Sequence, residues 1–178
     1  MFIRVATEDD AQQLIDIYRP YVENSTTSFE YTVPSVDDFR QRIHHIKIKY
    51  PYLVMVDQET ILGYAYAHEY KERSSYQWTV EISVYLSKNA QGKGIGKKLY
   101  QSLESYLIRQ NIVVIMASIT EANEASIAFH RHMGYEMTGH FKKIGFKHNR
   151  WLDIYWMQKR LSESSIPSSF IPFSQLKV

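Results

Sequence analysis

Glu81 is the residue whose type and position point most directly to acid–base chemistry. It lies in the run TVEISVYL (residues 79–86), whose other members are apolar or hydroxylated. A carboxylate in such a strand is solvated only where a cleft reaches it, and partial burial raises its pKa toward the range of a useful general base. The alternative is a structural glutamate on an open sheet face or beside an arginine. The sequence therefore offers Glu81 as a general base, with that alternative open.

A glycine-rich turn follows this strand. Residues 91–96 read QGKGIG, and Leu99, Leu103 and Leu107 then repeat every four positions on one helix face. A strand, a glycine turn and a helix N-terminus form a site for a phosphate-bearing ligand. The first N–H groups of the helix have no partners within it, and the helix dipole favours negative charge. The glycines let a ligand approach the backbone closely and allow positive φ.

Three interpretations of the glycine run compete. The plainest is an ordinary strand-to-helix turn. A dinucleotide or triphosphate loop does not fit, because the glycines stand at 92, 94 and 96 and GxxxxGK[ST] is absent. The pattern Q/R-x-x-G-x-G/A is met by Gln91, Gly94 and Gly96. Between a strand and an amphipathic helix, it resembles the pyrophosphate loop of the GNAT acetyltransferases, which bind acetyl-coenzyme A.

Length and composition indicate one globular domain. Of the 178 residues, 44% are hydrophobic and 22% charged, which suffices for a sizeable core. A net charge of +2 gives no argument for a nucleic-acid partner. The absence of cysteine excludes a cysteine nucleophile, disulfides and thiolate metal sites, and the histidines lack metal-ligand spacing, so we expect no metal. No signal peptide or membrane-length apolar run is found, so we expect a cytoplasmic protein with no membrane partner.

Periodicity and cap signals predict the elements that must position these residues. Helices are expected from a Thr7 cap through Val22, from a Ser35 cap to Tyr50, from the glycine turn to about Gln110, and over residues 121–133. Strands are expected at residues 2–6, 52–56, 61–69, 78–86, 113–119, 135–143 and 153–161, with a loop at 144–152. The order β-α-α-β-β-β-α-β-α-β-β predicts an α/β fold with a mixed sheet and helices on both faces. Residues 1–161 would form the single domain, and 162–178 a C-terminal surface arm.

Four separated segments carry a closer resemblance. They are residues 21–30 (YVENSTTSFE), 76–85 (YQWTVEISVY), 123–135 and 145–153 (GFKHNRWLD). In this order they resemble the phosphinothricin and methionine sulfoximine acetyltransferases of the GNAT superfamily, and the predicted element order matches the GNAT fold. The resemblance implies transfer of acetyl from acetyl-coenzyme A to the α-amino group of a small amino acid or analogue.

The resemblance also implies roles for individual residues. Glu81 matches the base of those enzymes, acting directly or through water. His130 would relay a proton or protonate the departing thiolate, unless it is a capped or surface histidine. Asn123 would bond the cofactor arm or simply cap its helix. Further cofactor contacts are expected from the central strand and the glycine turn: Val84, Tyr85, Leu86, Gln91, Gly92, Lys93, Gly94, Ile95, Gly96 and Lys97.

Acceptor recognition has weaker sequence signals. Candidate residues near the acceptor are Phe29, Glu30, Arg73, Tyr76 and Lys147. Arg73 would pair with the α-carboxylate, or else be a solvated charge. We expect direct attack in a ternary complex, because no cysteine is present to form an acyl-enzyme.

Other functions remain open at this point. The same chemistry could act on another amine, such as another amino acid, a protein N-terminus, a polyamine or an antibiotic. A non-catalytic acyl-coenzyme A sensor is the alternative from a different class. The aromatic residues of the C-terminal arm, together with the habit of the resembling family, favour a homodimer.

Overall fold

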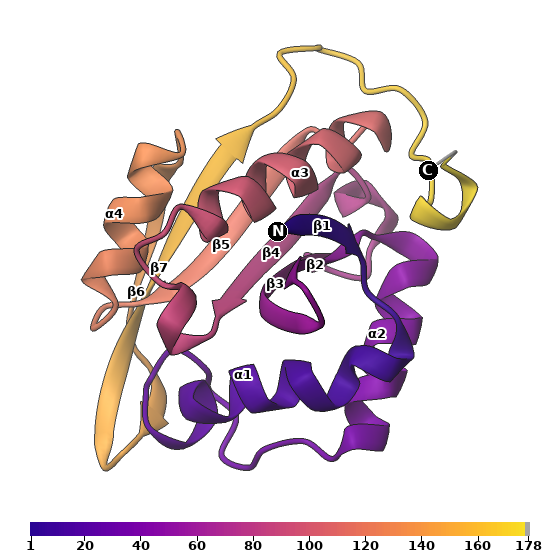
Figure 1. The fold of residues 1–178 in the computed structure, drawn as a ribbon. Helices are drawn as coiled ribbons and strands as arrows, with labels where there is room; N and C mark the ends of the chain where they lie inside the picture. Colours follow the sequence, from indigo (N-terminus) through magenta and orange to yellow (C-terminus); the bar gives the residue numbers. More distant parts are fainter. Residues whose placement is uncertain (177–178) are drawn as a thin grey trace.

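A mixed seven-stranded sheet forms the centre of the computed structural model, which describes residues 1–176 (Figure 1). The strands are β1 (Phe2–Val5), β2 (Tyr52–Asp57), β3 (Thr60–Glu69), β4 (Thr79–Leu86), β5 (Val114–Thr120), β6 (Glu136–Lys147) and β7 (Arg150–Arg160). Their order across the sheet is β1-β2-β3-β4-β5-β7-β6, and within the described chain every neighbouring pair except β4–β5 is antiparallel. The predicted mixed α/β fold and element order are confirmed.

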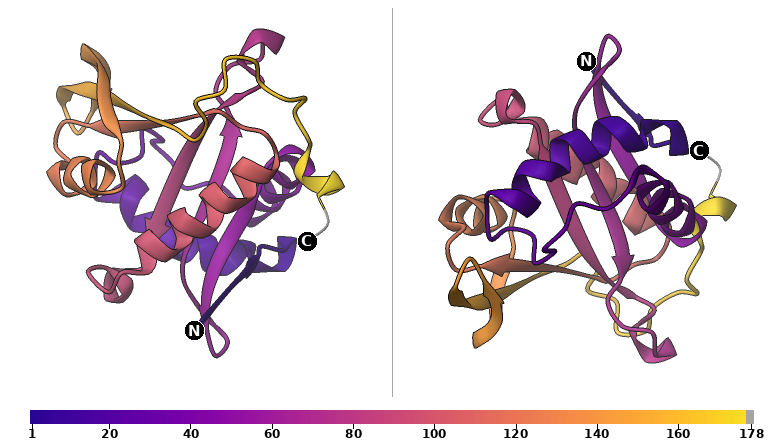
Figure 2. Two further views of the ribbon diagram at one scale, coloured as in Figure 1. Left: turned by 90° about the horizontal axis from the view of Figure 1, so that it is seen from above. Right: turned by 90° about the horizontal axis from the view of Figure 1, so that it is seen from below.

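Helices cover both faces of this sheet (Figure 2). They are α1 (Ala11–Glu23), α2 (Val36–Lys49), α3 (Ile95–Arg109) and α4 (Glu124–His132). Helices α1 and α2 pack on one face, and α3 and α4 on the other. The start of α2 is fixed as the sequence predicts, because the Ser35 side chain accepts from the Asp38 N–H and Asp38 bonds back to Ser35 N.

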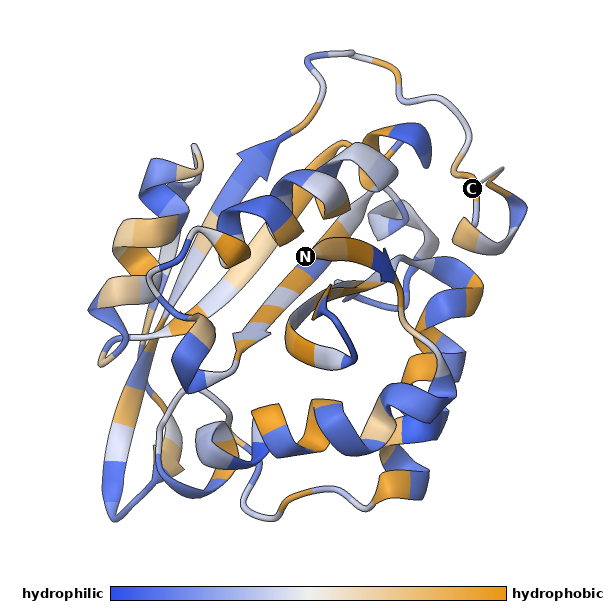
Figure 3. Ribbon diagram, in the orientation of Figure 1, coloured by the Kyte–Doolittle hydropathy of each residue, from blue (hydrophilic) through white to orange (hydrophobic). Residues whose placement is uncertain are grey.

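Alternation along the strands divides the buried side chains between two cores. In β2, Leu53 and Met55 belong to the cluster beneath α3, whereas Tyr52 and Val54 belong to the cluster beneath α1 and α2. This is the pattern of a sheet covered on both faces. Hydrophobic segments recur along α1 at helical spacing in Figure 3, as an amphipathic helix requires.

The parallel pairing of β4 with β5 is short. It joins Thr79 to Val114, Val80 to Ile115 and Glu81 to Met116, while β4 stays paired with β3 as far as Leu86. Because backbone groups alternate between the two edges of a strand, β4 beyond Glu81 turns half of its N–H and C=O groups toward the gap left by β5. The sheet therefore opens into a cleft immediately after Glu81.

The predicted loop at residues 144–152 is wrong. Strands β6 and β7 continue through it and meet at His148-Asn149, where φ is 49° and 58°. Two successive residues with positive φ form the tight turn whose twist suits a hairpin, so no longer loop is needed. Position 145 of β6 is occupied by glycine because a side chain there would collide with the ring of Phe29.

The predicted C-terminal arm packs against its own domain. Phe170 lies 5.7 Å from the ring of Tyr50, Phe173 is buried 5.4 Å from Tyr106, and Ile171 N–H donates to the Gln110 carbonyl. Residues 177–178 of the arm lie outside the described residues. Since these aromatic side chains find partners in the same chain, they no longer argue for a second subunit.

Candidate active site

The cleft between β4 and β5 brings together several of the predicted site residues. Its walls come from the diverging strands, from α3 and from α4, and its lining includes Val84, Tyr85, Thr120, Asn123 and His130. The Thr120 hydroxyl is buried there without a hydrogen-bond partner among the described residues. A buried polar atom without a partner is costly, so a ligand or water in the cleft would complete it.

The glycine turn lies at the N-terminus of α3, as predicted. Gly92 and Gly94 have φ values of 72° and 74°, and Gly94 is the N-cap. A Cβ at either position would meet nothing within 4 Å, so open space lies beside this backbone. Lys93 and Lys97 are exposed on the same turn. Unpaired helix N–H groups, open space and positive charge fit the pyrophosphate of acetyl-coenzyme A.

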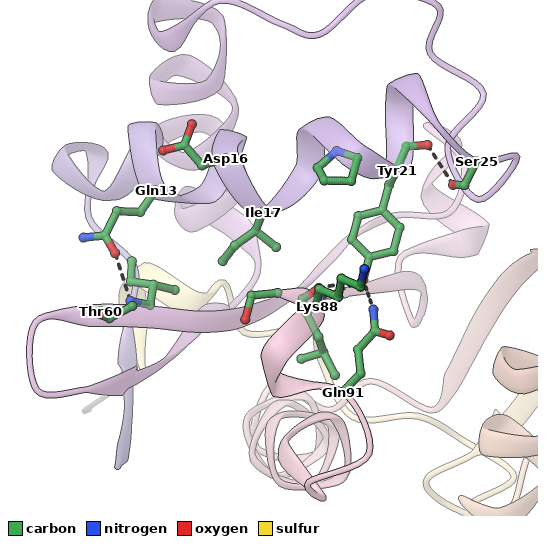
Figure 4. A pocket seen from close by; sticks show the side chains of 12 residues that line it. Gln13, Asp16, Ile17, Tyr21, Ser25, Thr60, Lys88 and Gln91 are labelled. Atoms are coloured by element: carbon green, nitrogen blue, oxygen red, sulfur yellow. Dashed lines mark hydrogen bonds between the residues drawn. The ribbon is translucent and has the colours of Figure 1, made fainter.

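Tyr21 of α1 connects the free edge of β4 to this turn. Its hydroxyl donates to the Leu86 carbonyl at 2.7 Å and accepts from Leu86 N–H at 3.3 Å and Gln91 Nε2 at 3.2 Å (Figure 4). A pocket of about 630 Å³ lies beside it, between α1, the start of β3 and the end of β4. The Leu86 backbone groups, predicted to bind the cofactor arm, are therefore held by a side chain that the sequence did not single out.

Glu81 lies where β4 and β5 separate. Val80 and Ile82 point into the core beneath α3, so alternation directs Glu81 to the opposite face, together with Ser83 and Tyr85. Burial raises the pKa of Glu81, and the nearby imidazole of His68 acts in the opposite direction. A partly buried carboxylate with a raised pKa, next to the point where two strands separate, is suited to accept a proton.

His130 is 3% exposed and lies in the wall of the cleft. Its Nδ1 is 2.7 Å from the Ser126 carbonyl, and its Nε2 is 2.8 Å from the Tyr100 hydroxyl. Burial lowers the pKa of His130, while the bond to Ser126 raises it. A carbonyl only accepts, so the neutral ring carries its proton on Nδ1 and Tyr100 donates to Nε2. Any proton that His130 exchanges with the cleft through Nε2 must therefore pass Tyr100.

Comparison with known proteins decides the family. A model described as the acetyltransferase (GNAT) domain matches residues 3–156. This chain belongs to the GNAT acetyltransferase family.

Individual relatives agree with this assignment. The chain is 31% identical to a phosphinothricin N-acetyltransferase of Streptomyces viridochromogenes, over 98% of this chain and 95% of that protein. It is 33% identical to an L-methionine sulfoximine/L-methionine sulfone acetyltransferase of Pseudomonas paraeruginosa, over 89% and 94%. A crystal structure of a phosphinothricin acetyltransferase from Sinorhizobium meliloti in complex with acetyl-coenzyme A superposes with a TM-score of 0.91, at 38% identity and 97% and 96% coverage.

In this GNAT acetyltransferase, two of the residues predicted to lie near the acceptor, Glu30 and Lys147, have buried polar atoms. Glu30 Oε1 accepts from Arg42 Nη2 at 2.6 Å, and its Oε2 is buried without a partner in residues 1–176. Lys147 is 3% exposed, and its Nζ donates to the Val22 and Ser28 carbonyls, each at 2.6 Å. Burial lowers the pKa of Lys147, and Glu30 opposes that shift. Lys147 thus ties the segment after α1 to β6, and its substrate role stays a prediction.

The other predicted residues lie in three places. Asn123 caps α4 by accepting from Ser126 N–H at 3.1 Å, and it also lies in the cleft wall, so the cap and cofactor interpretations are compatible. Arg73 is exposed, and Tyr76 packs on Tyr70. The contacts in the described part of the chain join neither of these two to Glu81.

Two other kinds of functional feature, a metal-binding group and a membrane-spanning helix, are absent from residues 1–176. Within residues 1–176, no group of three or more histidine, cysteine, aspartate or glutamate side chains is arranged to hold a metal ion. No helix in the same range has the length and apolar character needed to cross a membrane.

Proposed function

We propose that this GNAT acetyltransferase transfers acetyl from acetyl-coenzyme A to the α-amino group of a small amino acid or analogue, of the phosphinothricin or methionine sulfoximine type. One observation carries the proposal. The β4–β5 cleft opens next to Glu81, where the two strands separate, and β4, which forms one wall of it, runs on toward the turn suited to pyrophosphate at the start of α3. The relatives named for these acceptors are matched over nearly their whole length.

The residues suggest how the transfer would proceed. An α-amino group is largely protonated at neutral pH, and only the free amine can attack a thioester. Glu81 would accept one proton from the ammonium, directly or through water, and the amine nitrogen would then form its bond to the acetyl carbon as the carbon–sulfur bond breaks. The Val84 backbone would orient the acetyl carbonyl, and the turn at 92–97 would hold the pyrophosphate. The nitrogen loses its second proton as the amide forms; Nε2 of His130 would accept that proton through Tyr100 and return it by the same path to the departing thiolate.

A substrate panel tests the reaction. Purified protein and acetyl-coenzyme A would be mixed with phosphinothricin, methionine sulfoximine, methionine sulfone, the common amino acids, a peptide with a free N-terminus and a polyamine. Release of the thiol of coenzyme A would be followed with a chromogenic disulfide. We expect turnover with small amino acids or analogues. Turnover of peptide or polyamine alone would assign another amine, and tight cofactor binding without any turnover would favour a sensor.

The role of Glu81 is tested by Glu81→Gln, with the exposed Glu163→Gln as the matched control. Removing a general base should lower kcat by roughly 10²–10⁴-fold while the dissociation constant for acetyl-coenzyme A changes little. Calorimetry measures the second quantity. An unchanged kcat in Glu81→Gln would remove this residue from the base role.

We also propose that the protein is a cytoplasmic homodimer. The β6–β7 hairpin supports the dimer, because five large apolar side chains on it are 39–57% exposed: Met137, Phe141, Ile144, Phe146 and Trp151. The lack of cysteine fits a reducing compartment. Sedimentation of wild type and Phe141→Ser tests the dimer, and fractionation of the source cell tests the location. A wild-type monomer at assay concentration would refute the dimer.

A further inference from the structure

His68 lies directly opposite Glu81 in the sheet. Strand β3 pairs with β4 so that His68 faces Glu81, which in turn faces Met116 of β5. Side chains opposite one another on antiparallel strands share a face of the sheet, with Cβ atoms about 5 Å apart. His68 is half-buried. It therefore stands beside the partly buried carboxylate while retaining contact with solvent.

The hydrogen bond of the imidazole fixes which nitrogen carries the proton. His68 Nδ1 lies 3.1 Å from the Glu69 carbonyl oxygen. Since a carbonyl oxygen can only accept, Nδ1 must be the protonated nitrogen of the neutral ring. The lone pair is then on Nε2, the nitrogen on the far side of the ring from that carbonyl.

The proposed reaction creates a need for such a group. In each turnover Glu81 would gain one proton from the acceptor ammonium and must lose it before the next acceptor binds. Burial disfavours the ionised form of Glu81, so a neighbouring proton acceptor would help to return it to the carboxylate. An adjacent imidazole can accept that proton on Nε2, and the resulting imidazolium can release it to water.

We propose that His68 is a positioning residue that acts through Glu81: it takes the proton that Glu81 has accepted and carries it to solvent, which returns Glu81 to its ionised form. This inference rests on the proposed acetyl transfer. One proton passes from the acceptor nitrogen to Glu81, from Glu81 to Nε2 of His68, and from there to water. No electrons are transferred, and no other reactant is needed.

The other groups on this face are poorer proton acceptors than an imidazole. Strands β5 and β7 place the uncharged Met116 and Gln158 in the same row. The other titratable or charged side chains facing this region come from β3, the residue after β3, α1, the segment after α1, and α2: Tyr66, Tyr70, Tyr18, Glu30 and Arg42. Among these, Tyr18, Tyr66 and Arg42 have raised pKa values and hold their protons at neutral pH, and Glu30 is already bonded to Arg42.

The kinetic test uses His68→Asn, because the asparagine amide can still donate to the Glu69 carbonyl but offers no basic nitrogen. The exposed His45→Asn is the matched control. With saturating acetyl-coenzyme A, kcat of His68→Asn should fall roughly tenfold at pH 7, less than the loss of the base itself. The KM for acetyl-coenzyme A should be unchanged, and added imidazole should restore part of kcat. An unchanged kcat, or a loss that imidazole does not relieve, would overturn the proposal.

A second measurement does not need turnover, so it separates this inference from the proposed function. The side-chain carboxyl of Glu81 would be titrated by carbon-13 NMR, assigned by its absence in Glu81→Gln. Because the imidazolium lowers the pKa of Glu81, His68→Asn should titrate at higher pH than wild type or His45→Asn. Identical titrations in all three would refute the coupling, whatever the enzyme acetylates. His68→Gln provides a second variant if the asparagine form does not fold.

Discussion

Replacing Tyr21 with phenylalanine tests how α1 and the cofactor share the edge of β4. The change removes one hydroxyl and keeps the ring, which packs on Tyr85 at a centroid distance of 5.1 Å. Three hydrogen bonds disappear, two with the Leu86 backbone and one with Gln91. The exposed Tyr31→Phe is the matched control, because its hydroxyl donates to the Phe146 carbonyl away from β4.

The expected loss of folding free energy in Tyr21→Phe depends on how far water can replace these three bonds. An intramolecular hydrogen bond contributes about 0.5–1.5 kcal/mol, so three would contribute roughly 1.5–4.5 kcal/mol. The Gln91 side chain is exposed, and the Leu86 groups lie at the rim of a pocket that water can enter, so solvent replaces part of the loss. We expect a loss of about 1–2 kcal/mol. For a chain of this size that lowers Tm by about 2–8 °C.

The same substitution that lowers stability should strengthen the binding of acetyl-coenzyme A. If the arm of acetyl-coenzyme A bonds to Leu86, it must displace the Tyr21 hydroxyl in wild type but not in Tyr21→Phe. The variant should then bind the cofactor more tightly, by about fivefold for each 1 kcal/mol that wild type spends on displacement. Thermal unfolding without ligand measures the change in stability, and calorimetric titration with acetyl-coenzyme A measures the change in affinity. Weaker binding by Tyr21→Phe would show that Tyr21 supports the cofactor instead of competing with it.

Two further predictions concern buried charges. Lys147→Met should lower the free energy of unfolding by about 2–4 kcal/mol in urea denaturation, because two buried carbonyls lose their donor, whereas the exposed Lys142→Met should change it little. Glu81→Gln should gain stability relative to wild type as pH rises. The folded pKa of Glu81 lies above its ordinary value of 4.5, so the wild-type carboxylate loses folding free energy from about pH 4.5 up to the folded pKa. The free energy of unfolding of both proteins would be measured at pH 4 and pH 8. The same difference between variant and wild type at both pH values would contradict the prediction.

Much of the fold could be predicted because most elements carry a local signal. The leucines of α3 repeat at helical spacing and are fully buried in the structure, and Ser35 caps α2 as its spacing with Asp38 predicts. The β6–β7 hairpin was predicted too short because its turn contains His148-Asn149, which has positive φ without glycine. Its side chains are also largely exposed, so alternation between apolar and polar residues gives little guidance there.

The site was predictable only where one segment contains the whole signal. Glu81 and the glycine turn belong to one strand–turn–helix unit, so their types and spacing could be interpreted together. Tyr21 and Leu86 are 65 positions apart, and nothing local in either segment indicates that they meet. His68 depends in the same way on the register between β3 and β4. Contacts of this kind are set by packing, which a single sequence does not display.

The geometry of Glu81 is a consequence of its neighbours in β4. Val80 and Ile82 are buried in the core beneath α3, which fixes the rotation of the strand and so directs the carboxylate to the opposite face. The same rotation turns alternate backbone groups toward the gap that opens because β4 and β5 pair over only three positions. One strand therefore presents the proposed base, Glu81, on its face and hydrogen-bonding groups along its edge. A substitution that repacks Ile82 would displace both at once, so we expect it to lower kcat and weaken the binding of acetyl-coenzyme A together.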